Sequence, residues 1–133
     1  MKKAFTLIEL IIVVIIVGIL VSIAMPKFTF VAERAKAAEG VEILGSIRRA
    51  QIRYFSLHND YAMSINEIDI EIPQMKFFLS TSPMKWENPP GGGTIVGIAQ
   101  RERGIYALFI TEAGEIRCGG AANYCNKLGY PSP

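Results

Sequence analysis

An uninterrupted apolar run near the N-terminus constrains this chain more than any other feature. Between Leu10 and Met25 every residue is apolar except Gly18 and Ser22, and none carries a charge. As a helix, the stretch from Phe5 to Met25 would be about 30 Å long at roughly 1.5 Å per residue. That length matches the hydrocarbon thickness of a bilayer. We therefore expect a membrane-spanning helix in this part of the chain.

The charges around the run predict its orientation. Lys2 and Lys3 precede it, and positively charged flanks stay on the cytoplasmic side of a membrane. The residues after Pro26 should then lie outside the cytoplasm.

A secretory signal peptide is the competing interpretation of the same segment. Residues 22–24, Ser-Ile-Ala, resemble the small-residue site at which such signals are cut. Two features oppose this interpretation: Glu9 interrupts the junction of the basic and apolar regions, and the run exceeds the usual length of about 7–15 residues.

Glu9 is the one acid in the otherwise uncharged segment. A carboxylate there costs on the order of 1–3 kcal/mol depending on its depth, so an intramembrane acid predicts a functional site with a partner. If the chain is cut before Phe5, the new α-amine of a neighbouring subunit can neutralise Glu9. Pairing within one helix, and a carboxylate that reaches the membrane surface, are the alternatives.

The residues from Lys3 to Glu9, Lys-Ala-Phe-Thr-Leu-Ile-Glu, followed by the Ile/Val/Leu run, resemble the class III signal of type IV prepilins. The resemblance implies cleavage between Ala4 and Phe5 by a prepilin peptidase, which then methylates the amino group of Phe5. It also implies that Glu9 guides a new subunit into a growing filament by pairing with a neighbouring N-terminus. Ala4 departs from the pattern, because the family almost always has glycine before the cut.

Gly18 and Pro26 fall where members of this family have a glycine and a proline. In assembled filaments of the family the helix between them is often unwound. Glycine is a poor helix former and proline removes one helical hydrogen bond, so the resemblance and the chemistry agree on Gly18 and Pro26 as helix-unwinding positions.

Past the apolar run, the sequence becomes amphipathic and stays free of proline from Val31 to Phe55. Apolar residues recur there at helical spacing, which predicts one buried face: Ile43, Ile47, Ala50 and Tyr54. We expect a single helix from Phe5 to about Phe55, although Gly40 and Gly45 weaken it by about 1 kcal/mol each relative to alanine.

After residue 59 the patterns indicate strands and loops. We expect an edge strand at 68–72, an extended piece at 75–79, a loop at 83–93, strands at 94–100, 104–111 and 115–118, and a hairpin turn at 111–114. This predicts an α+β fold: a long N-terminal α-helix packed on a small antiparallel sheet of about three strands. The expected divisions are a leader at 1–4, a hydrophobic helix at 5–26, its amphipathic continuation at 27–58 and a β-rich head at 59–133.

Cys118 and Cys125 are the two cysteines of the chain. Outside the cytoplasm such a pair should oxidise to a disulfide, with two free thiols as the alternative. Many type IV pilins have a C-terminal disulfide loop, so the pair fits the resemblance. We expect residues 129–133 to form an exposed, poorly ordered tail.

Several classes of function are disfavoured. The net charge of +2 is too small to indicate a nucleic-acid partner, and the three arginines at 48, 49 and 53 are typical of a solvated helix face. His58 is the single histidine and has no cysteine nearby, so we expect no catalytic residues, no metal site and no cofactor. The glycines at 91–93 lack the Gly-Lys-Ser/Thr that a phosphate-binding loop requires.

The resemblance implies a structural subunit of a type IV pilus rather than an enzyme. The chain would be a single-pass inner-membrane precursor, handled by the prepilin peptidase and an inner-membrane assembly platform, and then part of an extracellular homopolymer. The alternative is a pseudopilin of a type II secretion system, a family that usually binds calcium through acids near the C-terminus and often lacks the cysteine pair. Here no acid follows Glu115. A third possibility is a bitopic membrane sensor that never polymerises, which failure of cleavage after Ala4 would favour.

Overall fold

The computed structural model describes residues 4–133 and every side chain among them except that of Ala122. The two lysines of the expected leader, Lys2 and Lys3, lie outside the described residues. The chain divides into two units, Met1–Arg34 and Ala35–Pro133, and each is described by itself. One helix, α1 (Leu7–His58), contributes its first part to one unit and its second part to the other.

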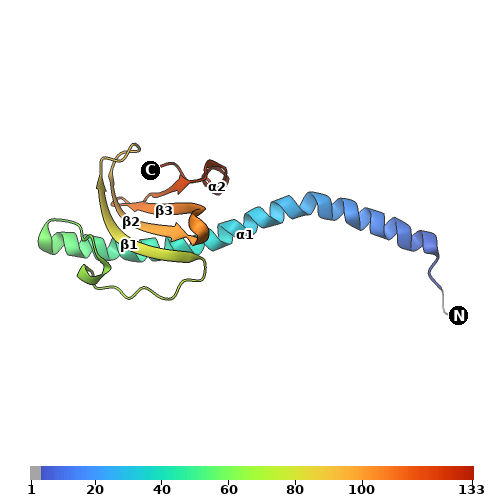
Figure 1. Cartoon of the computed structure of the whole chain (residues 1–133), viewed down its shortest axis with the longest axis horizontal. Helices are drawn as coiled ribbons and strands as arrows, with labels where there is room; N and C mark the ends of the chain where they lie inside the picture. Colours follow the sequence, from blue (N-terminus) through green and yellow to red (C-terminus); the bar gives the residue numbers. More distant parts are fainter. Residues whose placement is uncertain (1–3) are drawn as a thin grey trace. The chain divides into compact units, whose positions relative to one another are not determined.

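The second unit contains a four-stranded antiparallel sheet in the order β1-β2-β3-β4 (Figure 1). Its strands are β1 (Phe78–Glu87), β2 (Thr94–Arg101), β3 (Tyr106–Thr111) and β4 (Ile116–Gly120). The short helices are η1 (Ile65–Glu67), η2 (Glu102–Gly104) and α2 (Ala122–Leu128). Each strand pairs with the next along the chain, so the sheet is a meander, and the expected α+β fold is confirmed.

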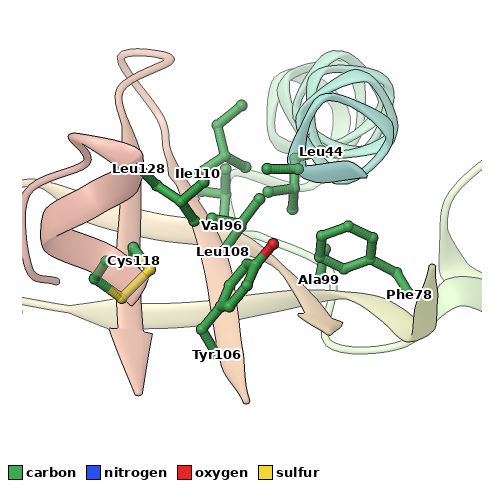
Figure 2. Packing of buried hydrophobic residues seen from close by; sticks show 11 residues of the cluster. Leu44, Phe78, Val96, Ala99, Tyr106, Leu108, Ile110, Cys118 and Leu128 are labelled. Atoms are coloured by element: carbon green, nitrogen blue, oxygen red, sulfur yellow. A yellow bond between two sulfur atoms is a disulfide. The ribbon is translucent and has the colours of Figure 1, made fainter. Parts of the chain in front are cut away.

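One face of α1 packs on the sheet. Ile43, Ile47 and Ala50 are buried and Tyr54 packs against them, so the helical face predicted from their spacing is confirmed. Leu44, one position along, is fully buried and lies against Val96, Leu108 and Ile110 of the sheet (Figure 2). The core therefore lies between one helix and one face of the sheet.

Gly40 lies inside α1 because a larger residue would not fit. A Cβ atom at this position would lie 2.6 Å from the ring of Phe78, the first residue of β1. The missing side chain therefore allows the Phe78 ring to pack directly on the helix backbone, which explains a residue that is otherwise unfavourable in a helix.

The strand expected at residues 68–72 does not exist. Ile68 is buried and Ile70 and Ile72 are half-buried, and all three pack on the same helical face of α1 as Ile47. The segment runs along the helix without a neighbouring strand. The alternation of apolar and acidic residues was therefore a signal of one-sided burial, not of strand pairing.

The expected loop at 83–93 is also wrong in its first half, because β1 continues through Pro83 to Glu87. Proline is tolerated in this strand since β1 forms an edge of the sheet, where one side of the backbone needs no partner. Pro83 lies opposite Gly97 of β2, and a register shift follows it. The sheet consequently has four strands and not three, and the loop is confined to residues 88–93.

The disulfide between Cys118 and Cys125 is confirmed, with a Cα–Cα distance of 5.4 Å. Between the two cysteines the chain leaves β4 and begins α2, a helix that the sequence did not predict. The C-terminal tail is not free: the amide of Cys118 donates to the carbonyl of Pro131 over 2.8 Å, and Tyr130 packs against the core. The expectation of a poorly ordered tail is therefore wrong at these positions.

Gln51 is a fully buried polar side chain on α1. Its amide nitrogen donates to the carbonyls of Ala62 (2.8 Å) and Val96 (3.0 Å), and its oxygen accepts from the amide of Ala62 (2.8 Å). One side chain thus fixes the chain that follows α1 and the start of β2.

Replacing Gln51 by leucine should lower the free energy of unfolding by about 2–4 kcal/mol, because three buried backbone groups lose their partners. Thermal unfolding of the full chain in detergent measures the effect. Gln100→Leu, at an exposed position of β2, is the matched control and should change stability by less than about 0.5 kcal/mol. Equal stabilities of the two variants would show that the Gln51 bonds contribute nothing net.

Removing the disulfide with Cys118→Ser and Cys125→Ser together should cost about 2.5 kcal/mol, the chain entropy released when a loop of roughly eight residues opens. The same unfolding assay measures it. Addition of a reductant should lower the midpoint of the native chain and leave that of the double variant unchanged.

Candidate functional site

The first unit presents an apolar surface along the first part of α1. The large apolar side chains from Leu7 to Met25 are between 46% and 76% exposed. None of the 18-residue stretch with the highest hydropathy is buried inside the structure, and α1 is long and apolar enough there to cross a membrane. A surface of this kind is stable only when lipid or other apolar helices cover it.

A capping box begins α1. The carboxylate Oε2 of Glu9 accepts hydrogen bonds from the amide (2.9 Å) and the hydroxyl (2.6 Å) of Thr6. The Thr6 hydroxyl in turn lies 3.4 Å from the amide of Glu9. These reciprocal bonds satisfy amide groups that the first turn of a helix leaves without partners. The helix consequently begins at Leu7, two residues after the position expected from the sequence.

Thr6 is the residue that sequence reasoning missed. The signal was present, because Thr6-Leu7-Ile8-Glu9 has the Thr-x-x-Glu spacing of a capping box before an apolar run. The cap uses only one oxygen of the carboxylate: within residues 4–133 the structure records no hydrogen bond to Oε1 of Glu9. The geometry therefore permits a second partner.

Ala4 and Phe5, the two sides of the expected cut, precede the helix and have no regular secondary structure. Both are exposed, with the Phe5 side chain 87% accessible. A protease requires an accessible peptide bond, and the bond between these residues is exposed and lies outside the helix.

Gly18 and Pro26 are both helical in this structure. Apart from the adjoining backbone of the helix itself, no described atom lies within 4 Å of the place where a Cβ of Gly18 would be, so the absence of a side chain here serves no other contact within the described residues. Pro26 has no amide hydrogen and cannot donate to the carbonyl of Ser22. The helix therefore has one missing hydrogen bond at the end of the apolar run.

His58 is the single histidine of the chain, and the structure places it at the end of α1. Its ring stacks on Tyr54 with centroids 4.1 Å apart. Within residues 4–133, no three His, Cys, Asp or Glu side chains lie in a group that could hold a metal ion.

Comparison with known proteins points to the same N-terminal region. The family model described as "Prokaryotic N-terminal methylation motif" matches residues 1–25. Over 67 residues the chain is 44% identical to the type IV major pilin protein PilA of Myxococcus xanthus, which covers 50% of this chain and 30% of the relative. It is 36% identical over 61 residues to a fimbrial protein of Neisseria meningitidis serogroup B, covering 46% of this chain and 36% of the relative.

A third relative is the type IV major fimbrial protein FimA of Dichelobacter nodosus, 46% identical over 48 residues, which are 36% of this chain and 30% of the relative. The matched segment thus spans about a third of the length of these curated relatives, and no solved structure gives a significant match. The methylation motif and these relatives make the N-terminal part of this chain similar to type IV pilin and fimbrial proteins, and together with a long apolar helix and an α+β head they support a type IV pilin family.

Proposed function

We propose that this chain is the structural subunit of a type IV pilus filament. A prepilin peptidase cuts between Ala4 and Phe5 and methylates the new amine, and the mature subunit polymerises through the first part of α1. Before assembly the subunit is held in the inner membrane, and the assembly platform there transfers it to the filament.

The observation that carries this proposal is the exposed apolar surface of α1 within the residues that match a methylation motif. Lipid can cover that surface in the precursor, and the same surface of other subunits can cover it in a filament. Exchange of one apolar environment for the other changes the hydrophobic free energy little. The specific polar contacts at the helix N-terminus therefore supply a larger share of the free energy that favours assembly.

Glu9 is suited to two roles at once. Oε2 holds the cap with Thr6, while Oε1 is available to the charged amine of Phe5 on a neighbouring subunit. In apolar surroundings such a pair is favourable mainly because the alternative is an unpaired charge.

The remaining expectations at the N-terminus are part of the proposal. Residues 1–4 are the leader, 5–26 the polymerisation helix, 27–58 its amphipathic continuation and 59–133 the head. In the filament, the segment between Gly18 and Pro26 is the place where α1 unwinds, since it contains a glycine and ends at the missing hydrogen bond of Pro26.

A pilus subunit is favoured over a pseudopilin of a type II secretion system by the Cys118–Cys125 disulfide. The relatives above are also described as pilin and fimbrial proteins.

Cleavage is tested by intact-mass and N-terminal peptide analysis of the protein sheared from the cell surface. We expect a chain that begins with N-methylated Phe5 and has an oxidised cysteine pair. The same N-terminus confined to the membrane fraction would favour a pseudopilin. An intact Met1, or a start near Met25, would contradict the proposal.

Substitution of Glu9 by glutamine separates its two roles, because glutamine can still accept from Thr6 but carries no charge. We expect Glu9→Gln to insert into the membrane normally and to lower the yield of sheared filaments about tenfold or more, the effect of losing roughly 1.4 kcal/mol of pairing. Immunoblots of the membrane and sheared fractions measure both quantities.

Thr6→Ala is the matched control, since it removes the two cap bonds that use the hydroxyl and keeps the carboxylate. It should cost the helix about 1 kcal/mol and lower the filament yield less than Glu9→Gln does. If Thr6→Ala abolishes filaments and Glu9→Gln does not, Glu9 acts as a helix cap and the pairing is wrong.

A further inference from the structure

The head has acidic side chains that its internal contacts do not neutralise. Glu39, Glu42 and Glu71 lie close together, and within residues 4–133 the structure records no ion pair for any of them. Glu39 accepts from the amides of Lys76 and Phe77, both at 2.8 Å, so its charge faces two backbone dipoles. Glu42 and Glu71 are exposed and have no such bonds.

These acids line a groove of about 320 Å³ between α1 and residues 70–75. The rest of its lining is largely apolar, with Ile43 from the helix and Ile72 and Met75 from the segment opposite. An apolar floor with a negative rim fits a long aliphatic side chain that ends in a positive charge.

The cations near the groove are engaged elsewhere: the ammonium groups of Lys36 and Lys76 lie over the Phe77 ring, 5.7 Å and 5.4 Å from its centroid. Arg49 donates to the hydroxyl of Ser46 over 2.8 Å, and Arg53 donates to the carbonyl of Asp69 over 3.0 Å. Neither guanidinium lies within ion-pair distance of a groove carboxylate, so the complementary charge has to come from another part of the head or from another molecule.

A matching surface lies at the other edge of the sheet. The segment before β1 borders the groove, whereas α2 packs on β4, the opposite edge strand (Figure 1). Lys127, in the last turn of α2, is exposed and has no ion pair recorded within the described residues. Tyr124 lies one turn earlier on the same face, and its ring is oriented by stacking on Tyr106 at 6.1 Å.

We propose that α2 of one copy of this chain docks in the groove of a second copy. The aliphatic stem of Lys127 lies on Ile72 and Met75, and its ammonium group binds between Glu42 and Glu71. The inference rests on the proposed function, because it names a head-to-head contact of the filament.

The arrangement also predicts how copies assemble. The two surfaces differ and lie on opposite edges of one head, so the contact is heterologous: one copy of a pair keeps its groove unused and the other keeps its α2 unused. Repetition of such a contact gives an open helical array, unless the rotation happens to close a ring.

Carbodiimide coupling of sheared wild-type filaments tests the contact, because this reagent joins an amine to a carboxylate that touches it. We expect mass spectrometry to identify peptides that join Lys127 to Glu42 or Glu71 of another copy. Lys127→Arg is the matched control: it keeps the charge and should keep the filament yield, but it cannot be coupled. Coupling of Lys127 only to other carboxylates would overturn the proposal.

Charge reversal tests the energetics. Lys127→Glu and Glu71→Lys should each lower the sheared-filament yield about fivefold or more, and their combination should restore most of it. Arg103→Glu, which reverses an exposed charge on η2, should leave the yield within about twofold of wild type. No loss in the single variants, or no recovery in the pair, would overturn the contact.

The outcomes also separate the two proposals. If wild-type cells yield no filaments that contain this chain, the proposed function fails and the contact fails with it. If wild-type filaments form and neither the coupling nor the charge reversal gives the expected result, only the contact fails. The amount of each variant in the membrane fraction shows that it has folded and inserted.

Discussion

A backbone surrounded by apolar groups must satisfy its own hydrogen bonds, and this constraint determines the form of α1. From Leu10 to Met25 the chain presents apolar side chains on every side, so its amides and carbonyls have no polar partners beyond its own residues. A helix is the one single-segment structure that pairs them all. The helical hydrogen bonds are incomplete at two places. In the first turn, Thr6 and Glu9 supply the missing partners, and at Pro26 one carbonyl is left without a donor.

The same requirement explains buried and half-buried polar side chains of the head. Irregular segments cannot pair their backbone groups with a strand, and side chains from regular elements do so instead. Gln51 bonds the chain near Ala62, Glu39 bonds the two amides before β1, and Arg117 donates to the carbonyls of Gly91 (3.0 Å) and Gly92 (2.8 Å) in the loop after β1. Each long polar residue thus substitutes for a missing strand partner, which keeps the loops in one conformation.

Sequence patterns predicted the parts of the fold that depend on local chemistry. The long helix, its buried face, strands β2 to β4 and the disulfide follow from periodicity, turn residues and compartment. Residues 68–72 and β1 were misassigned for one reason: whether an extended segment becomes a strand depends on a neighbour, and the neighbour is chosen by tertiary packing. The site was partly predictable as well, since Glu9 was identified by its position in an apolar run, whereas Thr6 required attention to its spacing from Glu9.

The two edges of the sheet restrict how copies of the head can meet. On β1, Pro83 has no amide hydrogen and a register shift follows it, so this edge is a poor template for another strand. On β4, the amide of Cys118 already donates to Pro131, and α2 is held against the strand by the disulfide. Strand addition is therefore disfavoured at both edges. Contacts between heads must then use side chains, and the surfaces with uncompensated charge are the ones that gain most from being paired.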